Sequence, residues 1–351
     1  MTLHANLRRA AGFPYVMEMR VEFPFPLLVC DVGGTNVRLS LVKTPGAPPL
    51  ALPPQKTADH PGLAQAVEAA LAGSGQRPRS LLLCAAGPNE GRRIQLTNAA
   101  WLIEGPQVAA ALGLEQGLMF NDFEAQALSL PSLREEWTVP IGAPREGDGG
   151  PLLVNGPGTG LGTAALIKAE GKWRAIASES GHLDFAPVTD EERAFWPHVE
   201  PVLGRITPEA LISGPGLRRL HRARLAALGL GRPELDGVEI VDLALADPAG
   251  EEAATIHTFW RLVARFVGDM AITFLSTGGI TLAGGILPRI VPLLDADDFR
   301  ASFERKAPYE WLVRRIPVRV LVERDTVLAG MADIAAHPQA YAIDYEARRW
   351  R

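Results

Sequence analysis

The residues best suited to bind an anion lie in two glycine-rich turns, each of which follows an apolar run. Gly33 and Gly34 come after Leu27–Asp31, and the turn Gly158–Gly162 comes after a run that starts at Leu152. Glycine has no Cβ, so the backbone N–H groups of such turns can approach an anion closely. Two turns that face each other would clamp a polyphosphate, although either turn alone is equally typical of an ordinary hairpin.

The two turns belong to an internal repeat. Leu27–Lys43 and Leu152–Lys168 align without a gap, and identical residues meet at several positions of the two segments. Each copy reads as an apolar strand, a tight turn of glycine and threonine, and a second strand. A repeat with one copy in each half of the chain predicts a duplicated scaffold that carries one glycine turn in each half.

A second group of candidate residues lies where a short strand, Leu118–Phe120, is followed by a helix, Phe123–Leu130. This junction carries Asn121 and Asp122. In an open α/β sheet, such a position directs side chains into the cleft at the carboxyl ends of the strands. Asp122 could therefore accept a proton from a substrate hydroxyl, although capping the helix is the commoner role of such a residue.

Further polar residues follow the second copy of the repeat. Glu179, His182 and Asp184 are close in sequence, but they would form a weak metal site because no further His or Cys lies near them. A carboxylate and an imidazole are better suited to bind adjacent sugar hydroxyls. Asn98 and Glu209 are similar polar residues beside apolar runs.

The elements that must position these residues alternate between strands and helices, which indicates an α/β architecture. A chain of 351 residues is long enough for two domains. The net charge of -5 argues against nucleic-acid binding, and no run of roughly 18 uncharged apolar residues suggests a membrane span. Cys30 and Cys84 lie in apolar runs, so buried thiols are expected rather than a disulfide.

A series of motifs along the chain resembles, in order, the motifs of the bacterial glucokinase family. They are DVGGTN at Asp31–Asn36, NDF at Asn121–Phe123, GPGTGLG at Gly156–Gly162, SESGHLDF at Ser178–Phe185, ISGPGL at Ile212–Leu217 and AGGILPR at Ala283–Arg289. The likeness runs from about Leu27 to Ala335. It implies the actin/hexokinase-type fold, in which two duplicated α/β domains enclose a central cleft. With only two cysteines, the chain resembles the group of these kinases without a cysteine zinc site.

The resemblance also implies a division of the chain and an activity. Residues 1–22 would be a disordered N-terminal extension, residues 23–131 plus 322–351 the small domain, and residues 132–321 the large domain. The family phosphorylates glucose at the 6-hydroxyl with ATP and Mg²⁺, and the same reaction is expected here. We expect a cytoplasmic homodimer that binds its small-molecule substrate and neither nucleic acid nor a membrane.

Residue by residue, the family pattern assigns four kinds of role. Asp122 matches the general base that takes the proton of the sugar 6-hydroxyl, and Asp31 matches the residue that holds Mg²⁺ through water. The residues that match sugar ligands are Asn98, Asn121, Asp122, Glu179, His182 and Glu209. The residues that match ATP ligands are Asp31, Gly33, Gly34, Thr35, Asn36, Gly158, Thr159, Gly160, Gly284 and Gly285.

One departure from the family pattern concerns the sugar pocket. Ser178 and Ser180 flank Glu179 where the family has glycines, and each adds a Cβ and a hydroxyl that can change sugar affinity or epimer tolerance. Two alternatives stay open. The first is a kinase for another hexose or with another phosphoryl donor, and the second is a sugar-sensing regulator that has lost catalysis. Asp122 and both glycine turns argue against the regulator.

Overall fold

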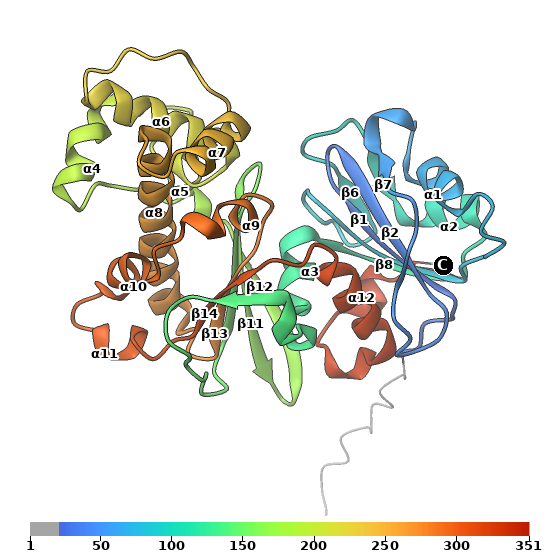
Figure 1. The fold of residues 1–351 in the computed structure, drawn as a ribbon. Coiled ribbons are helices and arrows are strands. Elements are labelled where there is room, and N and C mark those ends of the chain that lie inside the picture. Colours follow the sequence, from blue (N-terminus) through green and yellow to red (C-terminus); the bar gives the residue numbers. More distant parts are fainter. Residues whose placement is uncertain (1–20, 351) are drawn as a thin grey trace, which may run out of the picture.

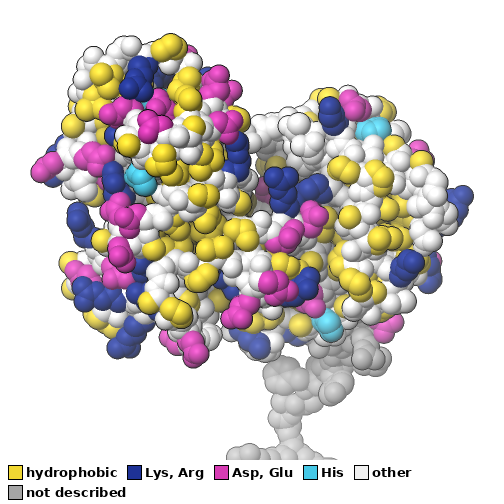
Figure 2. Space-filling model, in the orientation of Figure 1, with side chains coloured by type: hydrophobic (Ala, Val, Ile, Leu, Met, Phe, Trp, Pro, Cys, Tyr) yellow, Lys and Arg dark blue, Asp and Glu magenta, His cyan; other side chains and the backbone are white. Residues whose placement is uncertain are grey.

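The computed structural model describes residues 21–350, so all but the last two residues of the predicted extension lie outside the described part. Two α/β lobes lie side by side (Figure 1), and the surface of the molecule is hollowed between them (Figure 2). Across the described residues, no helix is long and apolar enough to cross a membrane. The α/β architecture that the alternation of elements predicts is confirmed.

The first lobe is built on a sheet from the N-terminal part of the chain. Its strands are β1 (Leu27–Val32), β2 (Asn36–Val42), β3 (Leu50–Ala51), β4 (Gln55–Lys56), β5 (Ser80–Ala85) and β8 (Gln116–Asn121). The strand order is β3-β2-β1-β5-β8, and β4 also pairs with β2. The parallel strands β1, β5 and β8 end together, so the residues that follow them meet at one edge. The strands β6 (Arg93–Gln95) and β7 (Leu102–Glu104) form a separate pair.

The second lobe is built on another six-stranded sheet. Its strands are β9 (Thr138–Pro140), β10 (Leu152–Pro157), β11 (Leu161–Ala169), β12 (Lys172–Ser178), β13 (Gly279–Leu282) and β14 (Val318–Leu321). The strand order is β12-β11-β10-β13-β14-β9. Again the strands β10, β13 and β14 are parallel, and the turns that follow β10 and β13 lie at the same edge.

The repeated segments form the matching hairpins that the sequence predicts. β1–β2 and β10–β11 are antiparallel pairs, and the first strand of each hairpin also pairs in parallel with a later strand. The two turns differ by one residue, because Val32 pairs with Val37 whereas Pro157 pairs with Leu161. The duplication is therefore confirmed in topology, with a tighter turn in the second copy.

Helices cover both sheets and also lie between them. In the first lobe, α1 (Leu63–Leu71) and α2 (Gly105–Leu112) pack on one face of the sheet. Between the sheets lie α3 (Asp122–Leu128) and α12 (Thr326–Ala336), whose apolar residues share one core with strands of both lobes. The other helices are α4 (Asp190–Phe195), α5 (Pro208–Leu211), α6 (Gly214–Ala227), α7 (Gly237–Ala246), α8 (Glu251–Phe274), α9 (Leu287–Ile290), α10 (Ala296–Glu304), α11 (Glu310–Val313) and α13 (Tyr345–Arg348). Because it is packed from both sides, α3 holds its N-terminus at the boundary between the lobes.

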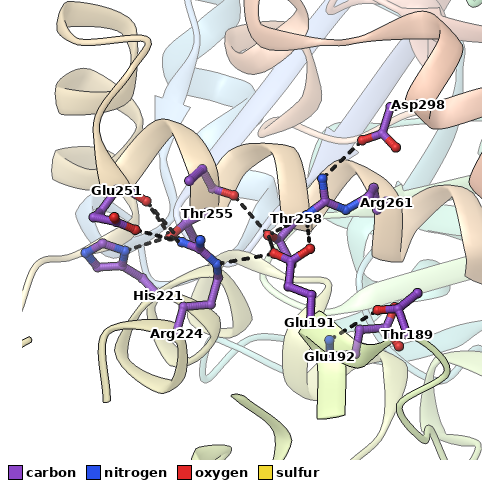
Figure 3. Close-up of polar contacts among 11 residues, drawn as sticks. Thr189, Glu191, Glu192, His221, Arg224, Glu251, Thr255, Thr258, Arg261 and Asp298 are labelled. Carbon is purple, nitrogen blue, oxygen red and sulfur yellow. Dashed lines mark hydrogen bonds and ion pairs between the residues drawn. The ribbon is translucent and has the colours of Figure 1, made fainter. Parts of the chain in front are cut away.

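A network of polar residues ties the helices of the second lobe together (Figure 3). Arg261 of α8 pairs with Glu191 of α4 at 2.6 Å and with Asp298 of α10 at 3.1 Å. The ring of His221 on α6 lies 2.8 Å from the hydroxyl of Thr255 on α8. Burial lowers the pKa of His221, so this ring is neutral at neutral pH. These contacts join α4, α6, α8 and α10 into one helical layer beside the second sheet.

Candidate active site

Asp122 is the first residue of α3 and directly follows the last residue of β8. The cap of this helix is its neighbour: the Asn121 Oδ1 accepts hydrogen bonds from the N–H groups of Phe123 at 3.0 Å and Glu124 at 3.3 Å. The Asn121 amide also donates to the Gly87 carbonyl at 3.1 Å. The alternative that Asp122 serves as the helix cap is therefore wrong, and its carboxylate is left for another role. Asn121 thus lies directly beside Asp122, and its role as a sugar ligand stays a prediction.

The surroundings of Asp122 make its carboxylate a better base than an ordinary one. Burial, followed by the nearby charge of Asp31, raises the pKa of Asp122 to about 6. Hydrogen bonds from the Phe123 backbone and the Asn121 side chain oppose this shift. A carboxylate with this pKa is still ionised at neutral pH and accepts a proton more readily than a solvated one.

Asp31, the expected Mg²⁺ residue, stands at the end of β1 in a fixed position. Its carboxylate forms an ion pair with Arg38 of β2, and Arg38 in turn pairs with Asp325 at 3.2 Å. The Cys84 thiol donates to Asp31 Oδ1 at 3.5 Å, and burial, followed by the charge of Asp31, raises the pKa of this thiol so that it stays protonated. Arg38 lies directly opposite Asp31 in the β1–β2 hairpin, and no motif in the sequence marks it as functional.

The first glycine turn brings Asn98 next to the phosphate-binding candidates. The Gly33 N–H donates to the Asn36 carbonyl at 2.9 Å, and the Thr57 hydroxyl donates to the Gly33 carbonyl at 2.9 Å. A Cβ on Gly34 would lie only 2.8 Å from the Cβ of Asn98. The absence of a side chain at Gly34 therefore allows Asn98, a predicted sugar ligand, to approach the turn. Thr35 and Asn36 lie exposed in it.

The second glycine turn is placed in the same way against Glu209. The Gly158 N–H donates to the Gly160 carbonyl at 2.8 Å, and a Cβ on Gly160 would lie 2.6 Å from Glu209 Oε2. The same carboxylate oxygen accepts the Leu161 N–H at 2.9 Å. Glu209, a predicted sugar ligand on α5, is thus fixed at the end of this turn, in which Thr159 is exposed.

The other predicted sugar ligands of the second lobe lie beside Glu209. His182 Nε2 is 3.9 Å from Glu209 Oε2, and Glu179 is exposed at the end of β12. The Ser178 hydroxyl accepts the Ser180 N–H at 3.2 Å, whereas the buried Ser180 hydroxyl has no hydrogen-bond partner among residues 21–350. Ser178, the last residue of β12, and Ser180 therefore flank Glu179 in the segment that presents Glu179 and His182.

Phe123 joins the base to the second glycine turn, which sequence reasoning did not foresee. A Cβ on Gly162 would lie 2.0 Å from the ring of Phe123, and one on Gly156 would lie 3.0 Å from it. The ring of the residue after Asp122 therefore fills the space that these two glycines leave in the second hairpin. Both glycines and Phe123 belong to the recognised motifs, but nothing in these motifs indicates that the three residues touch.

A pocket of about 440 Å³ continues from the second turn between α6, α7 and the turn after β13. Gly284 has φ +100°, and a Cβ there would lie 2.3 Å from the Pro157 carbonyl oxygen, so this turn requires glycine. The residues that line the pocket are Gly214, Pro215, Leu217, Arg218, Asp236, Gly237, Val238, Val241, Gly285, Ile286 and Arg289. Those from α6 and α7 beyond the recognised motifs carried no functional signal in the sequence.

The residues present fit a magnesium ion that is held mainly by a nucleotide. No group of three or more His, Cys, Asp and Glu side chains is arranged to hold a metal within the described range 21–350. Mg²⁺ usually keeps several waters and binds one or two carboxylates together with substrate phosphates. Asp31 and Asp122 are near enough for the charge of one to raise the pKa of the other, which provides the negative potential that such an ion needs.

The fold and the site together define a sugar kinase of the actin/hexokinase type, with one glycine turn from each lobe beside an acidic residue. A family model described as Glucokinase matches residues 28–338. A glucokinase of Sinorhizobium fredii is 40% identical over 333 residues, which are 94% of this chain and 98% of that protein. The chain belongs to the glucokinase family, and the resemblance indicated by the motifs is confirmed.

Solved structures agree with this assignment. A glucokinase from an Antarctic psychrotroph superposes with a TM-score of 0.78 at 28% identity, covering 89% of this chain and 98% of that chain. A ROK family glucokinase of Streptomyces griseus in complex with glucose and AMPPNP has a TM-score of 0.59 at 23% identity, covering 88% and 98%. The second likeness is one of fold, and it supports the actin/hexokinase-type assignment over most of the chain.

Proposed function

We propose that the protein transfers the γ-phosphoryl group of ATP to the 6-hydroxyl of glucose. The observation that carries this proposal is the state of the Asp122 carboxylate at the boundary of the two lobes. This carboxylate does not serve as the cap of α3, and its pKa is raised to about 6. Its environment is that of a general base. The glucokinase relatives, one of them 40% identical, support glucose as the sugar.

The reaction follows from the positions of the groups. Asp122 takes the proton of the 6-hydroxyl while that oxygen forms a bond to the γ-phosphorus, and the bond from this phosphorus to the bridging oxygen breaks to release ADP. Phosphoryl transfer depends mostly on positioning and on stabilising charge. Backbone N–H groups of the two glycine turns would provide both for the phosphates, and Mg²⁺ held by Asp31 through water would neutralise phosphate charge.

The ligands are assigned to the two lobes as follows. The first lobe would contribute Asn98, Asn121 and Asp122 to the sugar, and the second would contribute Glu179, His182 and Glu209. The pocket of about 440 Å³ beside Gly285 would take the adenosine. The division into a small domain (23–131 plus 322–351) and a large domain (132–321), the cytoplasmic location, the homodimer and a role in glycolysis stay predictions.

A coupled assay with ATP and Mg²⁺ across glucose, mannose, fructose and N-acetylglucosamine tests the proposal. Glucose should have the highest kcat/KM. A higher kcat/KM for another hexose would favour the alternative of a kinase for that hexose. Binding of glucose without turnover of any sugar would favour the regulator, because both lobes would then hold the sugar without the reaction.

The pKa of Asp122 determines the expected pH dependence. Burial and the charge of Asp31 raise this pKa to about 6, and the carboxyl accepts a proton only when it is ionised. The value of kcat/KM for glucose, which reports groups of the free enzyme, should therefore fall about tenfold for each pH unit below 6. A profile measured between about pH 4.5 and 8 checks this. An acid limb near the pKa of a solvated carboxyl would contradict the assigned environment.

A further inference from the structure

The last described residues complete the sheet of the first lobe. Trp350 exchanges two backbone hydrogen bonds with Gly117 of β8, its N–H donating at 3.1 Å and its carbonyl accepting at 3.0 Å. β8 is the end strand of that sheet, so Trp350 adds to its edge. The indole is buried, and it fills the hollow that two glycines leave: a Cβ on Gly105 or Gly117 would lie 2.4 or 2.3 Å from the ring.

Arg348, two residues earlier, contacts the chain on both sides of Asp122. Its guanidinium forms a two-pronged ion pair with Glu124 in the first turn of α3, at 2.6 and 2.8 Å. It also donates to the Met119 carbonyl of β8 at 2.7 Å and lies over the Phe120 ring at 5.1 Å. One side chain therefore bridges the strand before Asn121–Asp122 and the helix after them.

This bridge is largely shielded from water and is held by a fixed segment. The side chains of Arg348 and Glu124 are only 16% and 21% exposed, and a two-pronged arginine–carboxylate pair restrains both distance and angle. Arg92 holds the same segment from the other side, donating to the carbonyls of Ala347 at 3.2 Å and Glu346 at 3.1 Å. The C-terminal segment is thus fixed to the lobe at both α13 and Trp350.

We propose that Arg348 is a positioning residue for the candidate base. By joining Glu124 to Met119, it fixes the angle between β8 and α3, and with it the place of the Asp122 carboxylate. This inference rests on the proposed role of Asp122. A misplacement of about 1 Å at a reacting group can cost about 10²-fold in rate. The C-terminal segment would then determine the rate of the reaction without contacting either substrate.

The neighbouring Arg349 provides a matched control. Within the described chain its side chain makes no hydrogen bond or ion pair, although its backbone N–H donates to Tyr345. Arg348→Gln and Arg349→Gln remove the same charge at adjacent positions. Arg348→Gln should lower kcat roughly 10–100-fold, whereas the dissociation constant for glucose, measured by calorimetry without ATP, should stay within about threefold. Arg349→Gln should leave both unchanged.

Two further variants separate positioning from a loss of folding. Arg348→Lys keeps the charge but cannot bridge Glu124 and Met119 with one planar group, so its kcat should lie between those of the wild type and Arg348→Gln. Glu124→Gln should lower kcat as well, and the double variant with Arg348→Gln should be no slower than the slower single variant, because both changes break one bridge. Each kcat is divided by the folded fraction at the assay temperature.

The outcomes that overturn the inference are distinct from those that overturn the proposed function. A folded Arg348→Gln with the kcat of Arg349→Gln would exclude positioning, and if that variant does not fold, a wild-type kcat in Arg348→Lys would exclude it. Additive losses in the double variant would also contradict a shared bridge. A wild-type protein that phosphorylates no sugar would instead refute the proposed function.

Discussion

Asp122→Asn should lower kcat by about 10²–10⁴-fold, because the amide cannot accept the proton of the 6-hydroxyl. The side chain keeps its size, so the dissociation constant for glucose should change only a few-fold. A coupled assay measures kcat, and a calorimetric titration without ATP measures binding. Turnover close to that of the wild type in a folded variant would exclude Asp122 as the base.

The same substitution should increase the stability of the fold at neutral pH. Since the folded-state pKa of Asp122 is raised to about 6, the stability that this carboxyl contributes is complete below its unfolded pKa of roughly 4 and is lost as the pH rises through the folded pKa. The Tm of Asp122→Asn relative to the wild type should therefore rise between about pH 4 and pH 7. A lower relative Tm at neutral pH would mean that the ionised carboxylate stabilises the fold.

Gly158→Val should block the binding of ATP without weakening the binding of glucose. A Cβ at Gly158 meets no atom within 4 Å, so the protein can accommodate the side chain, which would then occupy the space that a phosphate needs. The value of kcat/KM for ATP should fall at least about 10²-fold, because the side chain would keep a phosphate away from neighbouring backbone donors, each of which is typically worth about that much. Glucose binding measured by calorimetry should stay at the wild-type value.

Gly160→Val provides the contrast for this experiment. A Cβ there would lie 2.6 Å from Glu209 Oε2, so this substitution should weaken glucose binding together with ATP use. If both variants lost activity with ATP but kept wild-type glucose binding, Glu209 would not be a sugar ligand. If neither changed the KM for ATP, the turn would not hold the phosphates.

Local patterns in the sequence predicted the scaffold, whereas the ligand roles came from the resemblance to the family and stay predictions. The repeated strand–turn–strand segments predicted the two hairpins because a hairpin is specified by its own residues. The one-residue difference between the two turns was not predicted, because a gapless alignment of Leu27–Lys43 with Leu152–Lys168 conceals it. That Asn121 caps α3 was not predicted, because Asp122 is an equally good cap by residue type and was the expected one.

Contacts between distant parts of the chain had no signal in a single sequence. The pair of Glu124 and Arg348 is separated by 224 residues, and an arginine near the end of a chain is ordinarily a solvated charge. The packing of Phe123 against Gly162 likewise had no signal, because the sequence around each residue accounts for that residue without reference to the other. The raised pKa of Asp122 depends on burial, which the sequence does not contain.

The edge of β8 and the C-terminal segment also bear on how the protein is made. All six strands of the first sheet have been synthesised once Asn121 is added, yet Trp350, which pairs with the edge strand of this sheet, is synthesised much later than they are. Until then the emerging lobe presents an unpaired strand and an open hollow above Gly105 and Gly117. Unpaired edges of this kind invite pairing with other chains. A fragment that stops before Tyr345 should therefore aggregate during synthesis, and the first lobe should finish folding only after the strands of the second lobe have been synthesised.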